Sequence, residues 1–167
     1  YVILLCERLA PGQLGGRCHV LEFGSGKSSR VCYSTFSGEL QGAIRGLERG
    51  LLLQQWLTEV WRGLPGGVSG LITEPHTISL ETVVDARGLF DARVKRDMGK
   101  LADKSSVLYV VAYREAIRKR LIEAMHWVPT ESMLSEDLTK WMIEGSGLWP
   151  ILYACGFWQP FSRPDLK

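Results

Sequence analysis

Residues 34–62 read STFSGELQGAIRGLERGLLLQQWLTEVWR, and this stretch decides the fold. Ser34-Thr35 supplies a helix start, and apolar side chains then recur at helical spacing over about seven turns. These apolar positions are Phe36, Leu40, Ile44, Leu47, Leu51, Leu57 and Val60. The pattern predicts one long amphipathic helix that ends near Gly63 and packs against the other elements of the chain.

Strands are predicted on both sides of this helix. Residues 1–9 and 17–23 are rich in Val, Ile and Leu and flank a loop with several Gly and Pro residues, which predicts an antiparallel hairpin. The later part of the chain predicts strands over 78–84 and 121–128 and helices over 86–96, 107–119 and 130–143. The order is β-β-α-β-α-α-β-α, which is typical of a mixed α/β domain.

The chain of 167 residues has an ordinary globular composition, with 46% apolar residues, 23% charged residues and a formal net charge of +2. The small net charge excludes a globally basic nucleic-acid binder, so any such surface is local. No run reaches the roughly 18 apolar residues of a membrane helix, so we expect no membrane span. The start at Tyr1 lacks a basic segment, so it resembles a strand entered from upstream rather than a signal peptide.

The cysteines give a second indication of environment. Cys6, Cys18, Cys32 and Cys155 are irregularly spaced and form no C-x-x-C pair. This spacing argues against a zinc site and against a disulfide framework. The sequence therefore predicts buried, reduced thiols in an intracellular protein, without indicating a compartment.

Three carboxylates are candidates for chemistry. Glu39 lies in the first turn of the long helix, Asp85 directly follows an apolar strand, and Glu136 lies on the last predicted helix. Oxygen ligands gathered in this way suit a hard cation such as Mg²⁺. Two such ions clamp the attacking and leaving oxygens of a phosphodiester. We expect the three carboxylates to converge, and the alternative is that they are caps and surface charges.

A locally basic segment, residues 93–120, carries nine Lys and Arg residues against three acidic ones. Beside a carboxylate cluster, such a segment suits a nucleic-acid backbone. The candidates for this contact are Arg114, Arg118, Lys119 and Arg120. A solvated helix face is the alternative interpretation.

Two features predict close packing against a partner or against the domain itself. Gly38, Gly42, Gly46 and Gly50 recur every fourth residue on the long helix, although each costs roughly 1 kcal/mol relative to Ala. This stripe predicts that another backbone approaches the helix, either from this domain or from a partner. The tail, residues 144–167, concentrates aromatic side chains from Trp149 to Phe161, and either folds back or anchors a protein partner.

Three blocks resemble the ribonuclease H domain of copia-type retrotransposon polyproteins. They are TFSGEL at residues 35–40, VVDA at residues 83–86 and WVPTESMLSEDLTK at residues 127–140. Their order and spacing agree with the S-T-x-x-E helix start, the strand-end carboxylate and the V-P-T-x-x-x-x-A-D-x-L-T-K block of that family. The resemblance covers residues 1–143, which we take as the domain, with residues 144–167 as a separate tail.

The resemblance implies an RNase H-like fold, a mixed five-stranded sheet with flanking helices. It also implies four carboxylates that hold two Mg²⁺ ions and hydrolyse the RNA strand of an RNA–DNA hybrid during reverse transcription. Glu39 and Asp85 match the family's helix glutamate and strand-end aspartate. Glu136 stands where the family has its last aspartate.

Two departures from the family leave two functions open. The family's first strand, which carries its first aspartate, would precede Tyr1 and is lacking here. At Glu136 the extra methylene moves the carboxylate oxygens, in a kind of site where a shift of about 1 Å can cost 10²-fold in rate. One hypothesis is an endoribonuclease that is active if the missing strand and aspartate are supplied. The other is a catalytically incomplete, domesticated module that serves as a structural or binding subunit of a larger assembly.

Overall fold

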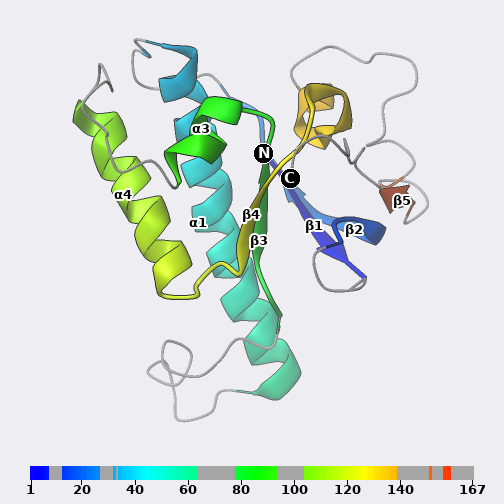
Figure 1. Ribbon diagram of the computed structural model, residues 1–167. Helices are drawn as coiled ribbons and strands as arrows, with labels where there is room; N and C mark the ends of the chain where they lie inside the picture. The colour runs from blue at the N-terminus through cyan, green and yellow to red at the C-terminus, as the bar shows by residue number, and fades with distance from the viewer. Residues whose placement is uncertain are drawn as a thin grey trace.

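The chain is a mixed α/β protein, as its sequence predicts (Figure 1). The computed structural model describes residues 1–7, 13–26, 32, 34–63, 78–93, 104–138, 151 and 156–158. The main elements are β1 (Val2–Cys6), β2 (Gly16–Phe23), α1 (Thr35–Arg62), β3 (Glu81–Val84), α3 (Arg87–Ala92), α4 (Lys104–Arg118) and β4 (Ala124–Trp127). Two short 3₁₀ helices, η1 (Thr130–Ser132) and η2 (Leu134–Leu138), and the short strand β5 (Phe157–Trp158) follow.

The structure confirms the predicted start and end of the long helix α1. The Ser34 side chain accepts a hydrogen bond from the backbone N–H of Ser37 at 3.2 Å, which caps the first turn. Gly63 has a φ of 74°, a conformation that glycine adopts without a steric penalty, and its N–H bonds to the carbonyl of Glu59. Leu40 and Leu47 are buried along the inner face of the helix, as the apolar spacing predicts.

The described strands form two separate small sheets rather than one. In the first sheet β1 pairs antiparallel with β2, and β2 pairs antiparallel with β5. The β1–β2 register shifts by one residue between Ile3 and Leu4, because it skips Leu21. In the second sheet β3 pairs parallel with β4. Among the described residues no ladder joins β1 to β3, so each of these strands has an edge without a strand partner.

The main core lies between the helices and the parallel strands. In Figure 1, α4 and α1 lie side by side on one side of β3 and β4, and the β1–β2 hairpin lies on the other side. Leu40, Val110 and Ile122 are buried at the centre of this core. Burying each such side chain contributes about 1.5–3 kcal/mol to the free energy that stabilises the folded state. A second cluster of buried residues joins β2 to the end of the chain through Cys18, Leu134 and Ile151.

The prediction of a helix over 130–143 is wrong for residues 130–138, the part of this segment that the structure describes. Residues 130–138 form η1 and η2, and the extended backbone of Met133 (φ −88°, ψ 103°) separates them. Contacts from distant residues account for the break. Leu134 packs in the cluster with Cys18 and Ile151, and the Trp158 indole N–H donates to the carbonyl of Ser132 at 3.3 Å. Residues 139–143 lie outside the described part.

The described part of the tail packs on the hairpin. Ile151 is buried, and the strand β5, which the sequence did not predict, pairs Phe157 with Arg17 and Trp158 with Gly16. The remaining aromatic residues of the tail, Trp149, Tyr153 and Phe161, lie outside the described residues. Within the part of the chain that the structure describes, no helix is long and apolar enough to cross a membrane.

Candidate functional site

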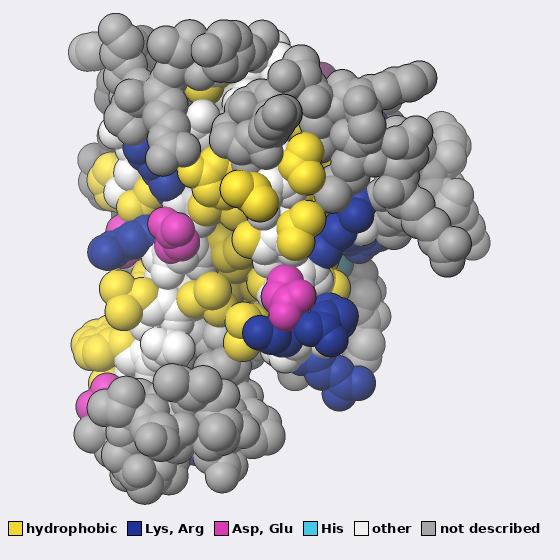
Figure 2. Space-filling model, turned by 90° about the vertical axis from the view of Figure 1, so that its left-hand side faces the viewer, with side chains coloured by type: hydrophobic (Ala, Val, Ile, Leu, Met, Phe, Trp, Pro, Cys, Tyr) yellow, Lys and Arg dark blue, Asp and Glu magenta, His cyan; other side chains and the backbone are white. Residues whose placement is uncertain are grey.

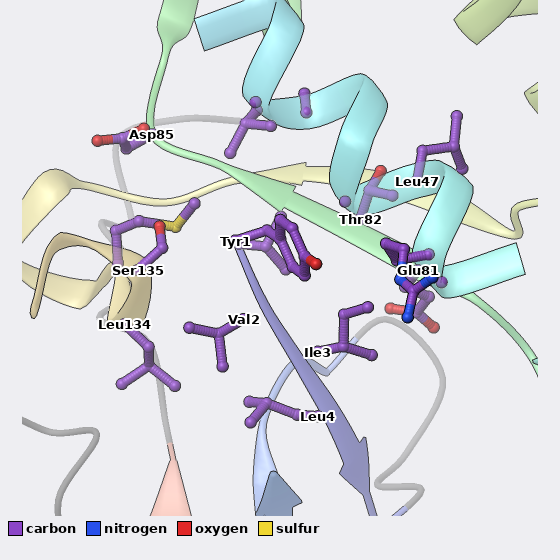
Figure 3. Close-up of a pocket in the computed structure, with 18 of the residues that line it drawn as sticks. Tyr1, Val2, Ile3, Leu4, Leu47, Glu81, Thr82, Asp85, Leu134 and Ser135 are labelled. Atoms are coloured by element: carbon purple, nitrogen blue, oxygen red, sulfur yellow. The ribbon is translucent and has the colours of Figure 1, made fainter. Parts of the chain in front are cut away.

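A cleft of about 870 Å³ lies between β1 and β3. Figure 3 shows Val2, Ile3 and Leu4 of β1 on one side of this cleft, with Thr82 of β3 across from them. The glycine-bearing face of α1 and the residues of η2 also line it. The facing edges of the two sheets therefore open onto a shared space.

All three predicted carboxylates line this cleft. Burial raises the pKa of Glu39 above its usual value, and the negative charges of Asp85 and then Glu136 raise it further. Like charges act on one another in this way only at close range. Glu39, Asp85 and Glu136 thus reach one cleft from α1, the end of β3 and η2, and their convergence on a single point stays a prediction.

Local structure fixes where each carboxylate leaves the backbone. Glu39 follows the capped first turn of α1 and precedes the buried Leu40. Asp85 follows the buried Val84, and its carbonyl accepts a hydrogen bond of 2.8 Å from the indole N–H of Trp127.

Glu136 is placed by η2 rather than by the predicted helix. Its N–H bonds to the carbonyl of Met133 at 3.1 Å, and its Oε2 atom is buried.

The oxygen atoms of the three carboxylates are suitable ligands for a hard cation, although the carboxylates are not arranged around a single metal position. Three carboxylates supply only oxygen atoms, and a divalent cation would relieve the repulsion that raises the pKa of Glu39. Among the described side chains, however, no group of three or more His, Cys, Asp or Glu residues is arranged to hold a metal ion. The three carboxylates are also fewer than the four that the family resemblance implies.

The predicted nucleic-acid contacts divide into two groups. The Arg114 guanidinium donates through Nε and Nη2 to the carbonyl of Ala92, so this side chain ties α4 to the end of α3. The other three basic residues, Arg118, Lys119 and Arg120, are exposed at the end of α4, where Arg118 and Lys119 form ion pairs of 2.9 and 3.2 Å with Glu115. Figure 2 shows basic side chains gathered around an acidic one on this face.

The basic cluster and the carboxylates lie at opposite ends of the parallel strands. Arg120 comes shortly before β4, whose first residue Ala124 pairs with Glu81 at the start of β3. Asp85 instead follows the last residue of β3. The structure therefore does not bring the basic cluster beside the carboxylates.

The glycine stripe faces the hairpin and the cleft. A Cβ atom at Gly46 would lie 3.3 Å from the Cβ of Tyr1, and one at Gly50 would lie 3.1 Å from Cδ1 of Leu80. Close packing within this domain accounts for these two positions. A Cβ atom at Gly42 would meet nothing within 4 Å, and Gly42 lines the cleft.

The cleft itself was not predicted as a site. The signal that bears on it is the resemblance, which implies a further strand beside β1. Comparison with protein-family models, with curated proteins and with solved structures finds no match to this chain.

Proposed function

We propose that this chain is an RNase H-like module of retrotransposon origin and that Glu39, Asp85 and Glu136 belong to its metal-dependent hydrolytic site. The observation that carries the proposal is electrostatic. Burial raises the pKa of Glu39 in the shared cleft, and the charges of Asp85 and Glu136 raise it further. Glu39 and Asp85 match the motifs of the family that the sequence resembles, and Glu136 stands where that family has its last aspartate.

The three carboxylates would hold Mg²⁺ through their oxygens. When bound, two such ions supply a clamp for the attacking water and the leaving oxygen of the RNA strand. The protein's other residues would hold the backbone that carries these carboxylates in place. The Trp127 indole holds the carbonyl of Asp85, and the Ser34 cap fixes the first turn of α1, which precedes Glu39.

The test is cleavage of an RNA–DNA hybrid by the full chain, with the RNA strand labelled and with Mg²⁺ or Mn²⁺ present. We expect metal-dependent cleavage of the RNA strand that falls by at least about 10²-fold in Asp85→Asn. The matched control is Glu131→Gln, an exposed glutamate of η1 that does not line the cleft. The proposal of an active enzyme fails if no metal supports cleavage, or if Asp85→Asn cleaves as fast as the control.

A second function, a binding module, is favoured by one edge of β1 and one edge of β3 that have no strand partner among the described residues. β1 and β3 belong to separate sheets, and both line the cleft. An extended polypeptide segment inserted between them would pair with both edges, which is a common mode of peptide recognition. It would occupy the position that the family's first strand takes. In this role the chain is a subunit that an added strand completes, and Gly42 leaves room for the added backbone beside α1.

Synthetic peptides of alternating Val and Thr test this second function. We expect a fluorescent peptide of this kind to bind the full chain, and the same peptide with N-methylated amides to bind much more weakly, because it cannot donate ladder hydrogen bonds. Gly42→Leu should weaken binding by filling the cleft, whereas Ala112→Leu, on the exposed surface of α4, should not. Equal binding of the methylated and unmethylated peptides, or no binding of either, would exclude strand insertion.

A further inference from the structure

Two cysteines that are distant in the sequence meet across the β1–β2 hairpin. The Sγ atoms of Cys6 and Cys18 lie 2.7 Å apart. A disulfide bond is about 2.04 Å long, so the two sulfurs are within about 0.7 Å of bonding distance. Both residues are free thiols in the structure. The Sγ of Cys18 also donates a hydrogen bond to the carbonyl of Gly16 at 3.3 Å.

The strand register places this pair where a cross-strand disulfide fits. Cys6 lies directly opposite Cys18. The neighbouring N–H of Glu7 bonds to the carbonyl of Arg17 at 2.8 Å, while the N–H of Cys18 bonds at 3.0 Å to Gly156 instead of to β1. Cys6 and Cys18 are therefore a non-hydrogen-bonded pair, in which the Cα atoms approach to about 4.5 Å. That separation is within the range of disulfides, about 4.4–6.8 Å.

We propose that Cys6 and Cys18 are a site of reversible oxidation, which forms a disulfide across the hairpin when the chain meets a small-molecule disulfide such as oxidised glutathione. Cys6 is an exposed residue, whereas Cys18 is only 1% exposed. The thiol of Cys6 therefore reacts first. The exposure of Cys6 corrects the expectation from sequence that this thiol is buried.

The reaction is a double thiol–disulfide exchange. The deprotonated Sγ of Cys6 attacks one sulfur of the small disulfide, whose S–S bond breaks and releases one small thiol, which takes up a proton. The Sγ of Cys18 then loses its proton and attacks the Cys6 sulfur of the mixed disulfide, which releases the second small thiol. Two protein thiols are oxidised and one small disulfide is reduced to two thiols. Burial raises the pKa of both protein thiols, so the proximity of the two sulfurs is what favours the second step.

The test is incubation of the full chain with oxidised and reduced glutathione, followed by alkylation, peptide mapping and thermal melting. We expect a linked Cys6–Cys18 peptide in the wild type and in the control Cys32→Ser. The melting temperature should rise by roughly 6–12 °C on oxidation and return with dithiothreitol.

Single variants separate the two steps. Cys18→Ala should accumulate a mixed disulfide with glutathione at Cys6, because the resolving thiol is absent, and Cys6→Ala should leave Cys18 unmodified. The proposal is overturned if the wild type yields no Cys6–Cys18 peptide, or if Cys18 is glutathionylated in Cys6→Ala as readily as Cys6 is in Cys18→Ala.

Discussion

Arg49 of α1 and Glu22 of β2 form a two-pronged ion pair, with Nε 2.8 Å from Oε1 and Nη2 2.9 Å from Oε2. The hydroxyl of Tyr1 donates to the same Oε1 atom at 2.7 Å. One carboxylate therefore joins the start of β1, the end of β2 and the middle of α1. This link holds the hairpin beside the helix at the edge of the cleft, where β1 and β3 are not paired with each other.

The Glu22–Arg49 link predicts a pH-dependent stability. The Arg49 guanidinium, followed by the Tyr1 hydroxyl, holds the pKa of Glu22 below its usual value. Because the folded-state pKa is lowered, the stabilisation is present above the unfolded pKa of about 4.3 and is lost as the pH falls through the folded pKa. We expect Glu22→Gln to melt below the wild type at pH 7, and the two melting temperatures to converge as the pH falls through the lowered folded-state pKa of Glu22. A difference that does not change with pH would contradict this account.

The carboxylate cluster predicts a change in the titration of Glu39. Removing the charge of Asp85 in Asp85→Asn should lower the pKa of Glu39 towards its usual value, because one source of repulsion is lost. Glu136→Gln should lower it by less, since Asp85 has the larger effect. Carbon-13 NMR titration of the glutamate carboxyl groups measures both shifts. Glu131→Gln serves as the control and should leave the titration of Glu39 unchanged.

The glycine stripe predicts graded effects of alanine substitution. Gly42→Ala should stabilise the fold by about 1 kcal/mol, because alanine favours the helix and the new methyl group meets no atom within 4 Å. Gly50→Ala should gain less or lose stability, because its methyl group would lie 3.1 Å from Leu80. Urea unfolding of the two variants gives the comparison. Equal gains at both positions would mean that Leu80 does not constrain the helix.

The basic residues at the end of α4 predict a change in salt dependence. If this cluster contacts nucleic acid, replacing Arg118, Lys119 and Arg120 with Ala should lower the slope of log affinity against log salt by about 2–3 for an RNA–DNA hybrid.

Arg114→Ala provides a contrast, because its guanidinium bonds within the protein. It should destabilise the fold by about 1.5–3 kcal/mol through the loss of its bonds to Ala92. An unchanged slope in the triple variant would remove the cluster from any nucleic-acid interface.

The sequence predicts best the elements that local periodicity determines. The apolar spacing on α1, the hairpin and the two parallel strands all follow from patterns within single segments, and the structure contains them. The sequence blocks around Glu39, Asp85 and Glu136 led to three residues that line one cleft, and their convergence on a metal stays a prediction.

Elements that depend on distant partners could not be predicted in this way. The strand β5 has two residues and exists only because Gly16 and Arg17 pair with it. The expected helix after Pro129 gives way to 3₁₀ turns where Leu134 meets Cys18 and Ile151. Cys6 and Cys18 are 12 positions apart in the sequence, and this spacing alone does not indicate that strand pairing places them side by side.

The skipped residue in the β1–β2 register bears on how copies of this chain behave at high concentration. An edge strand is a template on which further strands can add without limit. Where the pairing passes over Leu21, the hairpin bends and its twist increases, so its exposed edge is not a flat template. Flat, in-register stacking of identical segments is what fibrils require. The same irregularity therefore discourages the repeated strand addition that leads to amyloid.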